Sequence, residues 1–384
     1  MMENNKQFWI ELKNDMIDAA PRFGIDQLKV TTAEPFTELK ERLIRHRERG
    51  HESGFEEPDL DLRTEPTLHM SDAKSLIAIA VAYPSKMKNA PVSEPGKRRG
   101  ILSRSAWGED YHQALRRRIA KLSEWIMERV PDAKLLSMVD TGALSDRAVA
   151  ERAGIGWSGK NCSIISPELG SWIYLGEIIT NMPLPPDQAL PDGCGDCTLC
   201  IDACPTEALV GPGQLNSQRC ISFITQTKGF VDDEMKLKIG NRLYGCDTCQ
   251  IVCPVNRKID IRRHPELEPD PEIVKPLLRP LLKLGNREFK EKFGTSSAAW
   301  RGRKPIQRNA LIGLGNFRDA ESVPDIADVL RADPRPELRA TAAWALGRIG
   351  SEEAIERLQE ARSEEKDVDV LSAIDRALDK QQKD

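Results

Sequence analysis

The chain has 384 residues, nine cysteines and a formal net charge of -4 at pH 7. This length exceeds one minimal hydrophobic core and predicts two or three domains. The small negative charge excludes a general attraction to nucleic acid or acidic membranes, so such binding would need a local basic patch. The first ten residues carry no secretory pattern, and the longest apolar run, Ser75–Tyr83, is about half a membrane span. We therefore expect a cytoplasmic protein with no membrane partner.

Helical and extended patterns alternate over residues 1–185. Apolar spacing predicts amphipathic helices at Phe8–Phe23 and Ala106–Val130. Ser145 is placed to cap a helix that runs to Ala153. Short apolar runs predict four strands, the last two joined around Pro167 and Gly170: Ser75–Tyr83, Leu135–Val139, Cys162–Ile165 and Trp172–Ile179. The order predicts an N-terminal α/β domain in a protein of the α+β class.

Two proline-rich stretches mark boundaries, because clustered prolines continue neither a helix nor a central strand. They are Pro183–Asp192 and Pro265–Pro280. We predict four regions: an N-terminal domain (1–185), a cysteine-rich domain (186–270), a basic connector (271–304) and a helical end (305–384).

Eight cysteines lie between residues 194 and 253, which indicates metal chemistry rather than disulfides in a reducing compartment. The first run has the spacing of bacterial ferredoxins, Cys-x-x-Cys-x-x-Cys-x-x-x-Cys-Pro. The second run departs from it, because its first cysteine lies far upstream. The runs are Cys194, Cys197, Cys200 and Cys204, then Cys220, Cys246, Cys249 and Cys253.

In two-cluster ferredoxins the cysteine before proline binds the other cluster. This rule assigns Cys194, Cys197, Cys200 and Cys253 to one 4Fe-4S cluster. It assigns the remaining four to a second: Cys204, Cys220, Cys246 and Cys249. Zinc is the alternative, but zinc ribbons lack the third cysteine and the Cys-Pro ending. Cys162 lies outside the array, and a structural role is favoured over a catalytic one.

Gly154-x-Gly156-x-x-Gly159-Lys160 matches the glycine pattern of dinucleotide sites. That pattern requires a strand before the glycines and a helix after them. Here the predicted order is reversed. The sequence therefore favours a glycine loop over another large cofactor and disfavours a nicotinamide or ATP site.

From Arg308 the chain repeats itself with an offset of 32 residues, so that Leu314-Gly315 aligns with Leu346-Gly347. Each unit reads as two helices joined by a short turn, which resembles a HEAT repeat. Two unrelated amphipathic helix pairs are the alternative.

The stretch from Lys275 to Arg308 holds ten Lys or Arg and only two acidic residues, Glu288 and Glu291. Such a stripe can neutralise phosphates, although a basic run is ordinarily a solvated face. The candidate RNA contacts are Arg279, Arg301, Arg303 and Lys304.

Three motifs together resemble the epoxyqueuosine reductase family: Val139-Asp140-Thr141-Gly142, the run from Glu151 to Asn161, and the eight cysteines with Arg219-Cys220-Ile221-Ser222. The resemblance implies reduction of the epoxide of epoxyqueuosine at the tRNA wobble position to give queuosine. It implies cobalamin and two 4Fe-4S clusters as cofactors, with the N-terminal domain binding cobalamin. It further implies tRNAs for Tyr, His, Asn and Asp as substrates, an external electron donor and a monomer.

The resemblance also implies roles for single residues. Asp140 matches the family's proton donor and a cobalamin contact, where the sequence alone favours a turn aspartate. We expect burial beside the corrin to raise the pKa of Asp140. Further cobalamin contacts are implied at Ser158, Asn161, Ser163, Ser222 and position 225, which is Thr225 followed by Gln226.

Two other functions remain open from the sequence. A related corrinoid reductive dehalogenase would carry an exported twin-arginine precursor, and none is present. An iron-sulfur electron carrier with a HEAT-like docking module would not need about 185 residues before its clusters.

Overall fold

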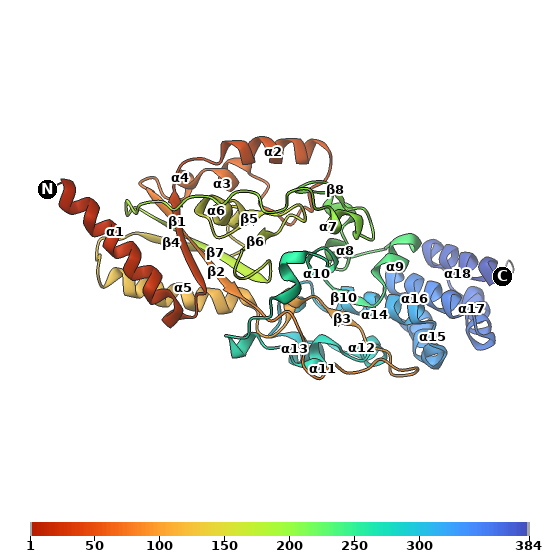
Figure 1. Cartoon of the computed structure of the whole chain (residues 1–384). Helices are drawn as coiled ribbons and strands as arrows, with labels where there is room; N and C mark the ends of the chain where they lie inside the picture. Colours follow the sequence, from red (N-terminus) through yellow and green to blue (C-terminus); the bar gives the residue numbers. More distant parts are fainter. Residues whose placement is uncertain (1, 382–384) are drawn as a thin grey trace. The chain divides into compact units, whose positions relative to one another are not determined.

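The computed structural model describes residues 2–381 (Figure 1). Its contacts divide the chain into two compact units, each assembled from three separate segments. Unit 1 holds residues up to Lys86, Glu109–Gln218 and Thr248–Glu268. Unit 2 holds Met87–Gly108, Arg219–Asp247 and the chain from Pro269 onward. Among the described residues, no helix combines the length and apolar character needed to cross a membrane.

Unit 1 is built on a four-stranded sheet in which every neighbouring pair is antiparallel. Its strands, in spatial order, are β1 (Gln27–Thr32), β2 (Ser75–Ala82), β7 (Ile173–Thr180) and β4 (Leu135–Met138). The strands predicted for the last three are confirmed to within one or two residues. The edge strand β1 was not predicted.

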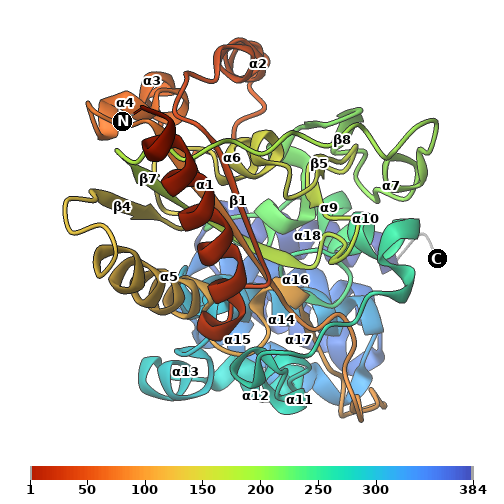
Figure 2. The same cartoon turned by 60° about the vertical axis from the view of Figure 1, so that its left-hand side comes forward.

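Helices cover both faces of this sheet, and alternate side chains of β2 are therefore buried on opposite sides. Ile77 and Ile79 belong to the core beneath α1 (Met2–Ala19) and α5 (Tyr111–Met127). Leu76, Ala78 and Ala80 belong to the core beneath α6 (Asp146–Ala153). Figure 1 shows α5 and α6 on opposite sides of the sheet, and Figure 2 views the same sheet with α1 in front of β1. The predicted layered α/β arrangement is confirmed.

The remaining elements of unit 1 are short. Two hairpins are β5 (Trp157–Ser158) with β6 (Ile164–Ile165), and β8 (Leu209–Gly211) with β9 (Gln214–Leu215). One longer helix is α2 (Thr37–Glu48). The other helical segments are η1 (Ala20–Phe23), α3 (Leu60–Thr64), α4 (Pro66–His69), α7 (Leu199–Asp202), α10 (Thr248–Ile251), η4 (Pro254–Lys258) and η5 (Pro265–Leu267). The turn η3 (Ser217–Arg219) ends the second segment.

Unit 2 begins with a small parallel pair, β3 (Ile101–Leu102) with β10 (Arg242–Tyr244). Around it lie short helices: η2 (Arg104–Ala106), α8 (Ile221–Ile224), α9 (Asp233–Ile239), α11 (Pro271–Val274), α12 (Leu278–Lys283), α13 (Asn286–Phe293) and η6 (Ser297–Ala299). The helical end follows with α14 (Arg303–Phe317), η7 (Ala320–Ser322), α15 (Val323–Ala332), α16 (Pro336–Ile349), α17 (Glu352–Glu364) and α18 (Val368–Gln381).

The helical end confirms the repeat and adds a helix, α18, that was not predicted. Gly315 and Gly347, which are equivalent in the repeat, both lie where helices approach closely. A Cβ at Gly315 would lie 2.7 Å from the Trp344 ring, and one at Gly347 would lie 2.6 Å from the Ala377 Cβ. The repeated Leu-Gly pair therefore lets α14 pack on α16, and α16 on α18.

Arg308 is buried at 1 % exposure and does not belong to a basic surface. Its guanidinium donates to the carbonyls of Ile224, Thr227 and Gly229. The prediction that the whole run from Lys275 to Arg308 is a surface stripe is therefore wrong at its last residue.

Candidate functional site

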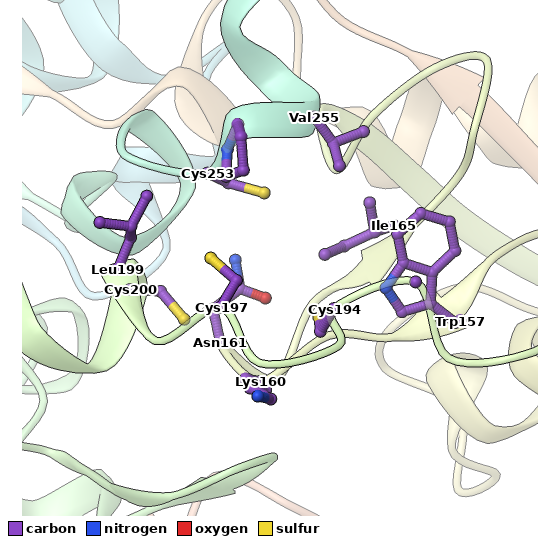
Figure 3. A pocket seen from close by; sticks show the side chains of 12 residues that line it. Trp157, Lys160, Asn161, Ile165, Cys194, Cys197, Leu199, Cys200, Cys253 and Val255 are labelled. Carbon is purple, nitrogen blue, oxygen red and sulfur yellow. The ribbon is translucent and has the colours of Figure 1, made fainter.

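Four cysteines line one pocket in unit 1 (Figure 3). Three come from the first run, and the fourth, Cys253, comes from the end of the second. The set is Cys194, Cys197, Cys200 and Cys253. This grouping agrees with the predicted crossed ligation, because the cysteine before Pro254 joins the first three.

Local hydrogen bonds shape the loop that carries the first three cysteines. The amide of Cys194 donates to Asp192 Oδ1 at 2.9 Å, and the amide of Cys197 donates to the Cys194 carbonyl at 3.1 Å. Lys160 Nζ donates to the carbonyl of Gly195. These bonds turn the chain so that successive thiols face one space.

The electrostatics of this pocket fit a bound metal cluster. Burial, together with the neighbouring Cys194 and Cys197, raises the pKa of the Cys200 and Cys253 thiols. Thiols gathered in this way ionise readily only when a cation compensates them. The indole N–H of Trp157 is buried in the pocket wall and has no hydrogen-bond partner among residues 2–381. Cluster sulfurs would accept such a bond.

The cysteines assigned to the second cluster are divided between the units. Cys204 and Cys249 lie in unit 1, and Cys220 and Cys246 lie in unit 2. Burial raises the pKa of Cys204, but backbone N–H groups outweigh burial and lower it. One of these donors is Ala208, whose nitrogen lies 3.3 Å from the Cys204 sulfur. The assignment of these four ligands remains a prediction.

The glycine motif forms the β5–β6 hairpin and not a dinucleotide loop. Helix α6 ends before Gly154, β5 lies between Gly156 and Gly159, and β6 follows the glycines, so the predicted order of helix and then strand is confirmed. The strand predicted over Cys162–Ile165 is confirmed only at Ile164–Ile165. A Cβ at Gly156 would lie 2.4 Å from the carbonyl oxygen of Ile165, so the hairpin itself requires glycine there. Cys162, in the hairpin turn, has a positive φ of 65°.

Asp140 lies directly after β4 in a tight turn. Its φ of 51° falls in the left-handed region, which is uncommon for non-glycine residues but which aspartate adopts in tight turns more often than most. The amide of Thr141 donates to the Val139 carbonyl, and the amide of Asp140 donates to Asp146 Oδ2 at 2.7 Å. The Asp140 side chain is 60 % exposed.

The sequence did not reveal the partner of Asp140. His112, in the first turn of α5, has Nε2 3.1 Å from Asp140 Oδ2 and Nδ1 2.7 Å from Asp110 Oδ1. The ring therefore bridges two carboxylates. Asp110 also caps α5 through the His112 amide. The Asp110-Tyr111-His112 stretch carried no recognisable motif, so only the tertiary fold identifies it.

The charge state of this group differs from the prediction. Surrounding protein raises the pKa of Asp140, but hydrogen bonds from His112 and Tyr111 outweigh that effect and lower it. Burial lowers the pKa of His112, but hydrogen bonds with Asp110 and Asp140 raise it to about 9. At neutral pH the protein alone therefore holds an ionised Asp140 beside a protonated His112. The expected upward shift at Asp140 is wrong for this state.

The other residues implied for cobalamin lie in two places. Ser158, Asn161 and Ser163 belong to the β5–β6 hairpin and its turn in unit 1. The Asn161 Oδ1 accepts from the Ser163 amide at 3.1 Å. Ser222 and Thr225 lie in unit 2 at α8. Thr225 is buried, and its hydroxyl donates to the Ser222 carbonyl and accepts from the Gly245 amide.

The hairpin residues fit a cofactor that carries many polar groups. No residue described in 2–381 hydrogen-bonds the hydroxyls of Ser158 and Ser163. Arg147 on α6 donates to the Cys162 carbonyl at 2.5 Å, and its charge also acts on Asp140. The Arg147 guanidinium thus lies near both the hairpin turn and the Asp140 turn. Ser158 and Ser163 supply hydroxyls that amide groups of a corrin would bind.

The four candidate RNA contacts all lie in unit 2. Arg279 pairs with Asp325 at 2.7 Å, and Lys283 shares the same carboxylate at 2.7 Å. Arg303 donates to Asn286 Oδ1 at 2.7 Å and to Gln307 Oε1 at 2.9 Å. Lys304 is exposed, and Arg301 donates to the Gln226 carbonyl. All four remain candidates, and Lys304 is the most exposed of them.

An exposed aromatic side chain adjoins them. Trp300 is 52 % exposed, and the Arg301 guanidinium lies 4.9 Å from the centre of its ring. Its indole nitrogen donates to Gln226 Oε1 at 2.7 Å. Exposed aromatics beside basic groups are typical of surfaces that stack RNA bases.

Comparison with known families assigns three parts of the chain. Residues 63–141 match the family described as epoxyqueuosine reductase QueG, DUF1730. Residues 193–256 match the 4Fe-4S double cluster binding domain, and residues 301–379 match HEAT repeats. The second match covers all eight array cysteines.

Individual proteins are similar over nearly the full length. Epoxyqueuosine reductase of Bacillus anthracis is 58 % identical, covering 96 % of this chain and 97 % of the relative. A crystal structure of epoxyqueuosine reductase with an epoxyqueuosine-modified tRNA-Tyr stem loop is 55 % identical, with a TM-score of 0.94 over 97 % of this chain and 99 % of that one. A Bacillus subtilis epoxyqueuosine reductase structure, with its catalytic aspartate loop swung out of the active site, is 54 % identical, with a TM-score of 0.94 over 96 % and 99 %.

Proposed function

Because the chain belongs to the epoxyqueuosine reductase family, we propose that Asp140 is the acid that protonates the oxygen released from the epoxide. The enzyme reduces the epoxide of epoxyqueuosine in tRNA and uses cobalamin and 4Fe-4S clusters. The observation that carries the proposal is the array of Asp140, His112 and Asp110 at the end of β4.

The reaction defines what the protein must supply. Opening the epoxide and releasing its oxygen as water consumes two electrons and two protons. The clusters deliver electrons from an external donor, and cobalamin, when bound, supplies the reduced metal centre for C–O cleavage. The protein side chains must therefore orient the nucleoside and deliver protons to the departing oxygen.

The His112–Asp140 pair suits proton delivery. In the protein alone the proton resides on His112, whose pKa of about 9 keeps it charged at pH 7. A substrate that covers the exposed Asp140 carboxyl would remove water from it and favour its neutral form. The proton could then pass along the 3.1 Å hydrogen bond from His112 Nε2 to Asp140 Oδ2. Asp140 is then the donor, and His112 reprotonates it.

The turn that carries Asp140 suits a mobile donor. A Bacillus subtilis relative has a catalytic aspartate loop that swings out of its active site. Asp140 likewise sits in a turn, with an exposed carboxyl and a left-handed φ of 51°. We assign the corresponding role to the Asp140 turn in this chain.

We further propose the crossed ligation of the clusters. Cys194, Cys197, Cys200 and Cys253 would hold the first cluster, and the pocket that these four share supports this set. Cys204, Cys220, Cys246 and Cys249 would hold the second, which rests on their spacing. Ser158, Asn161, Ser163 and Ser222 would contact cobalamin.

For the RNA, four basic residues would contact phosphates: Arg279, Arg301, Arg303 and Lys304. The substrates we propose are the tRNAs for Tyr, His, Asn and Asp, modified at the wobble position. A relative binds a tRNA-Tyr stem loop, which supports an anticodon stem-loop as the minimal substrate. We propose that the enzyme works as a monomer.

The test of the donor is Asp140→Asn, which preserves shape and removes the acid. Loss of a positioned general acid lowers a rate by about 10²- to 10⁴-fold. The assay is single-turnover reduction of a modified stem-loop under a strong chemical reductant, which bypasses electron delivery. The control is Asp132→Asn, an exposed aspartate at the turn before β4. Near-normal conversion by Asp140→Asn would remove it from this role.

A further inference from the structure

A buried carboxyl group lies under the Asp140 turn. Glu177, in β7, has no exposed surface. Its cross-strand neighbours are Ala78 in β2 and Met138 in β4, so apolar strands flank it on both sides. Neither of its oxygens receives a hydrogen bond from a conventional donor among residues 2–381. An ionised carboxylate is strongly disfavoured in such a place.

The group that faces Glu177 is a second carboxyl, that of Asp146. The two side chains lie within hydrogen-bonding reach of each other. Two carboxyl groups can form that bond only when at least one is protonated. The same Asp146 group accepts the amide of Asp140 through Oδ2 at 2.7 Å. Asp146 therefore connects the buried Glu177 to the backbone of the proposed donor.

We propose that Asp146 and Glu177 are positioning residues for Asp140: the two carboxyls share a proton, and Asp146 uses its remaining oxygen to hold the Asp140 amide. This inference rests on the proposed role of Asp140 as the proton donor. The hydrogen bond from the Asp140 amide to Asp146 favours this turn conformation, with its positive φ. While the turn is held in this position, the Asp140 carboxyl lies beside His112.

A simpler role for each residue leaves observations unexplained. Asp146 lies in the first turn of α6, where its negative charge would stabilise the helix through the helix dipole. That role requires no contact with Glu177 or Asp140. A glutamate in the middle of a buried strand destabilises the sheet unless it serves another group. Its carboxyl is aimed at Asp146, which is the one residue that holds the Asp140 amide.

Burial gives the pair a titration near neutral pH. Burial raises the pKa of Asp146 to about 7 although the hydrogen bond from the Asp140 amide lowers it, and burial with Asp146 raises the pKa of Glu177 well above its usual range. The other charged groups nearby are Asp110 and His112, which bind each other, and Arg147, which acts on Asp140. Below pH 7 Asp146 gains a proton and holds the amide more weakly.

The experiment compares Asp146→Ala, Asp146→Asn and Glu177→Gln in the holoenzyme with Asp140→Asn. Losing a hydrogen bond to a charged acceptor changes a free energy by about 1.5–3 kcal/mol, so we expect Asp146→Ala to slow single-turnover reduction by roughly 10- to 100-fold. Asp146→Asn retains an acceptor for the amide and a donor for Glu177, so it should recover most of the rate. Its pH profile should lose the inflection near 7.

Infrared spectroscopy provides a readout that does not depend on activity. The wild-type protein should show the C=O band of a protonated carboxyl at pH 8, and Glu177→Gln should lack it. Glu128→Gln, at an exposed carboxyl, is the matched control and should keep the band. Absorbance of the clusters and the corrin reports whether each variant has folded.

The outcomes separate the two proposals. If Asp140→Asn reduces substrate normally, the donor role fails whatever the other variants do. If Asp140→Asn is inactive but Asp146→Ala keeps the wild-type rate and pH profile, the positioning role alone fails. If Asp146→Ala does not fold, an Asp146→Asn profile that still inflects near pH 7, or a carboxyl band that survives Glu177→Gln, overturns the positioning role.

Discussion

Replacing Glu177 by glutamine should stabilise the protein increasingly as pH rises. Burial raises the pKa of Glu177, so the folded protein keeps a proton that the unfolded chain releases above a pKa of 4.5. A group of this kind stabilises the fold below its unfolded pKa, and that stability is lost as pH rises toward the folded pKa. Glutamine carries no proton to lose and escapes this effect.

The magnitude follows from linkage. One proton held only by the folded state changes the free energy of unfolding by about 1.4 kcal/mol per pH unit. Between pH 5 and 7 the variant should therefore gain up to about 2.7 kcal/mol over the wild type. Glu177 lies in unit 1, which holds roughly 200 residues. For a cooperative unit of that size, the gain corresponds to roughly 5–10 °C in melting temperature.

The assay is thermal unfolding of both anaerobic holoenzymes in matched buffers at one scan rate, with the melting-temperature difference plotted against pH. Glu128→Gln should give a flat difference, because its carboxyl is 75 % exposed. An imperfect fit of the amide shifts the whole curve downward by a constant amount, but the slope of the difference must be positive. A difference independent of pH would mean that Glu177 is ionised in the folded protein and would refute the reasoning.

Three further predictions concern the clusters, the RNA and the proton donor. Cys253→Ser should lower the iron content of reconstituted protein from about eight toward four per chain by removing the first cluster, whereas Cys162→Ser should leave it unchanged; equal iron in both, or loss of only the second cluster in Cys253→Ser, would contradict the crossed ligation. Arg301→Ala with Lys304→Ala should weaken stem-loop binding and flatten its log-log salt dependence by up to about two, whereas Arg331→Ala with Arg357→Ala should not; unchanged affinity at several salt concentrations would exclude a phosphate role. The single-turnover rate should fall as pH rises through about 9, where His112 loses its proton, and His112→Gln should be slow without that fall; a profile unaltered by the substitution would exclude His112 as the proton source.

The sequence predicted those features that depend on local patterns. The apolar runs at β2, β4 and β7 identified three strands of the sheet, and the run is longest at β2, because a strand buried on both faces needs an uninterrupted apolar run. The 32-residue offset identified the helical repeat, because Gly315 and Gly347 meet the same requirement for close packing. The spacing of the cysteines predicted Cys253 as a partner of the first run, and the pocket that these four cysteines line supports that prediction.

Features that depend on distant segments were not predictable. The segment Met87–Gly108 lies between two segments of unit 1 in the sequence but belongs to unit 2. Its strand β3 pairs with β10, which lies about 140 residues later. A run of two residues gives no strand signal of its own. Proline-rich boundaries divide a chain only in sequence order, so the predicted regions could not include such an exchange. The structure divides into two units, and the finer division into four regions remains a prediction.

Asp140 illustrates how a correctly chosen residue can be given the wrong charge. The sequence placed it after an apolar strand, and burial alone would raise its pKa. The fold brings His112 from 28 residues away, and a hydrogen-bonded imidazolium favours the ionised carboxylate. The proton needed for catalysis is then stored on the histidine, and the burial penalty falls on Asp146 and Glu177 instead. A donor built in this way depends on its partners, so the pH dependence of the reaction should report His112 and Asp146 rather than Asp140 itself.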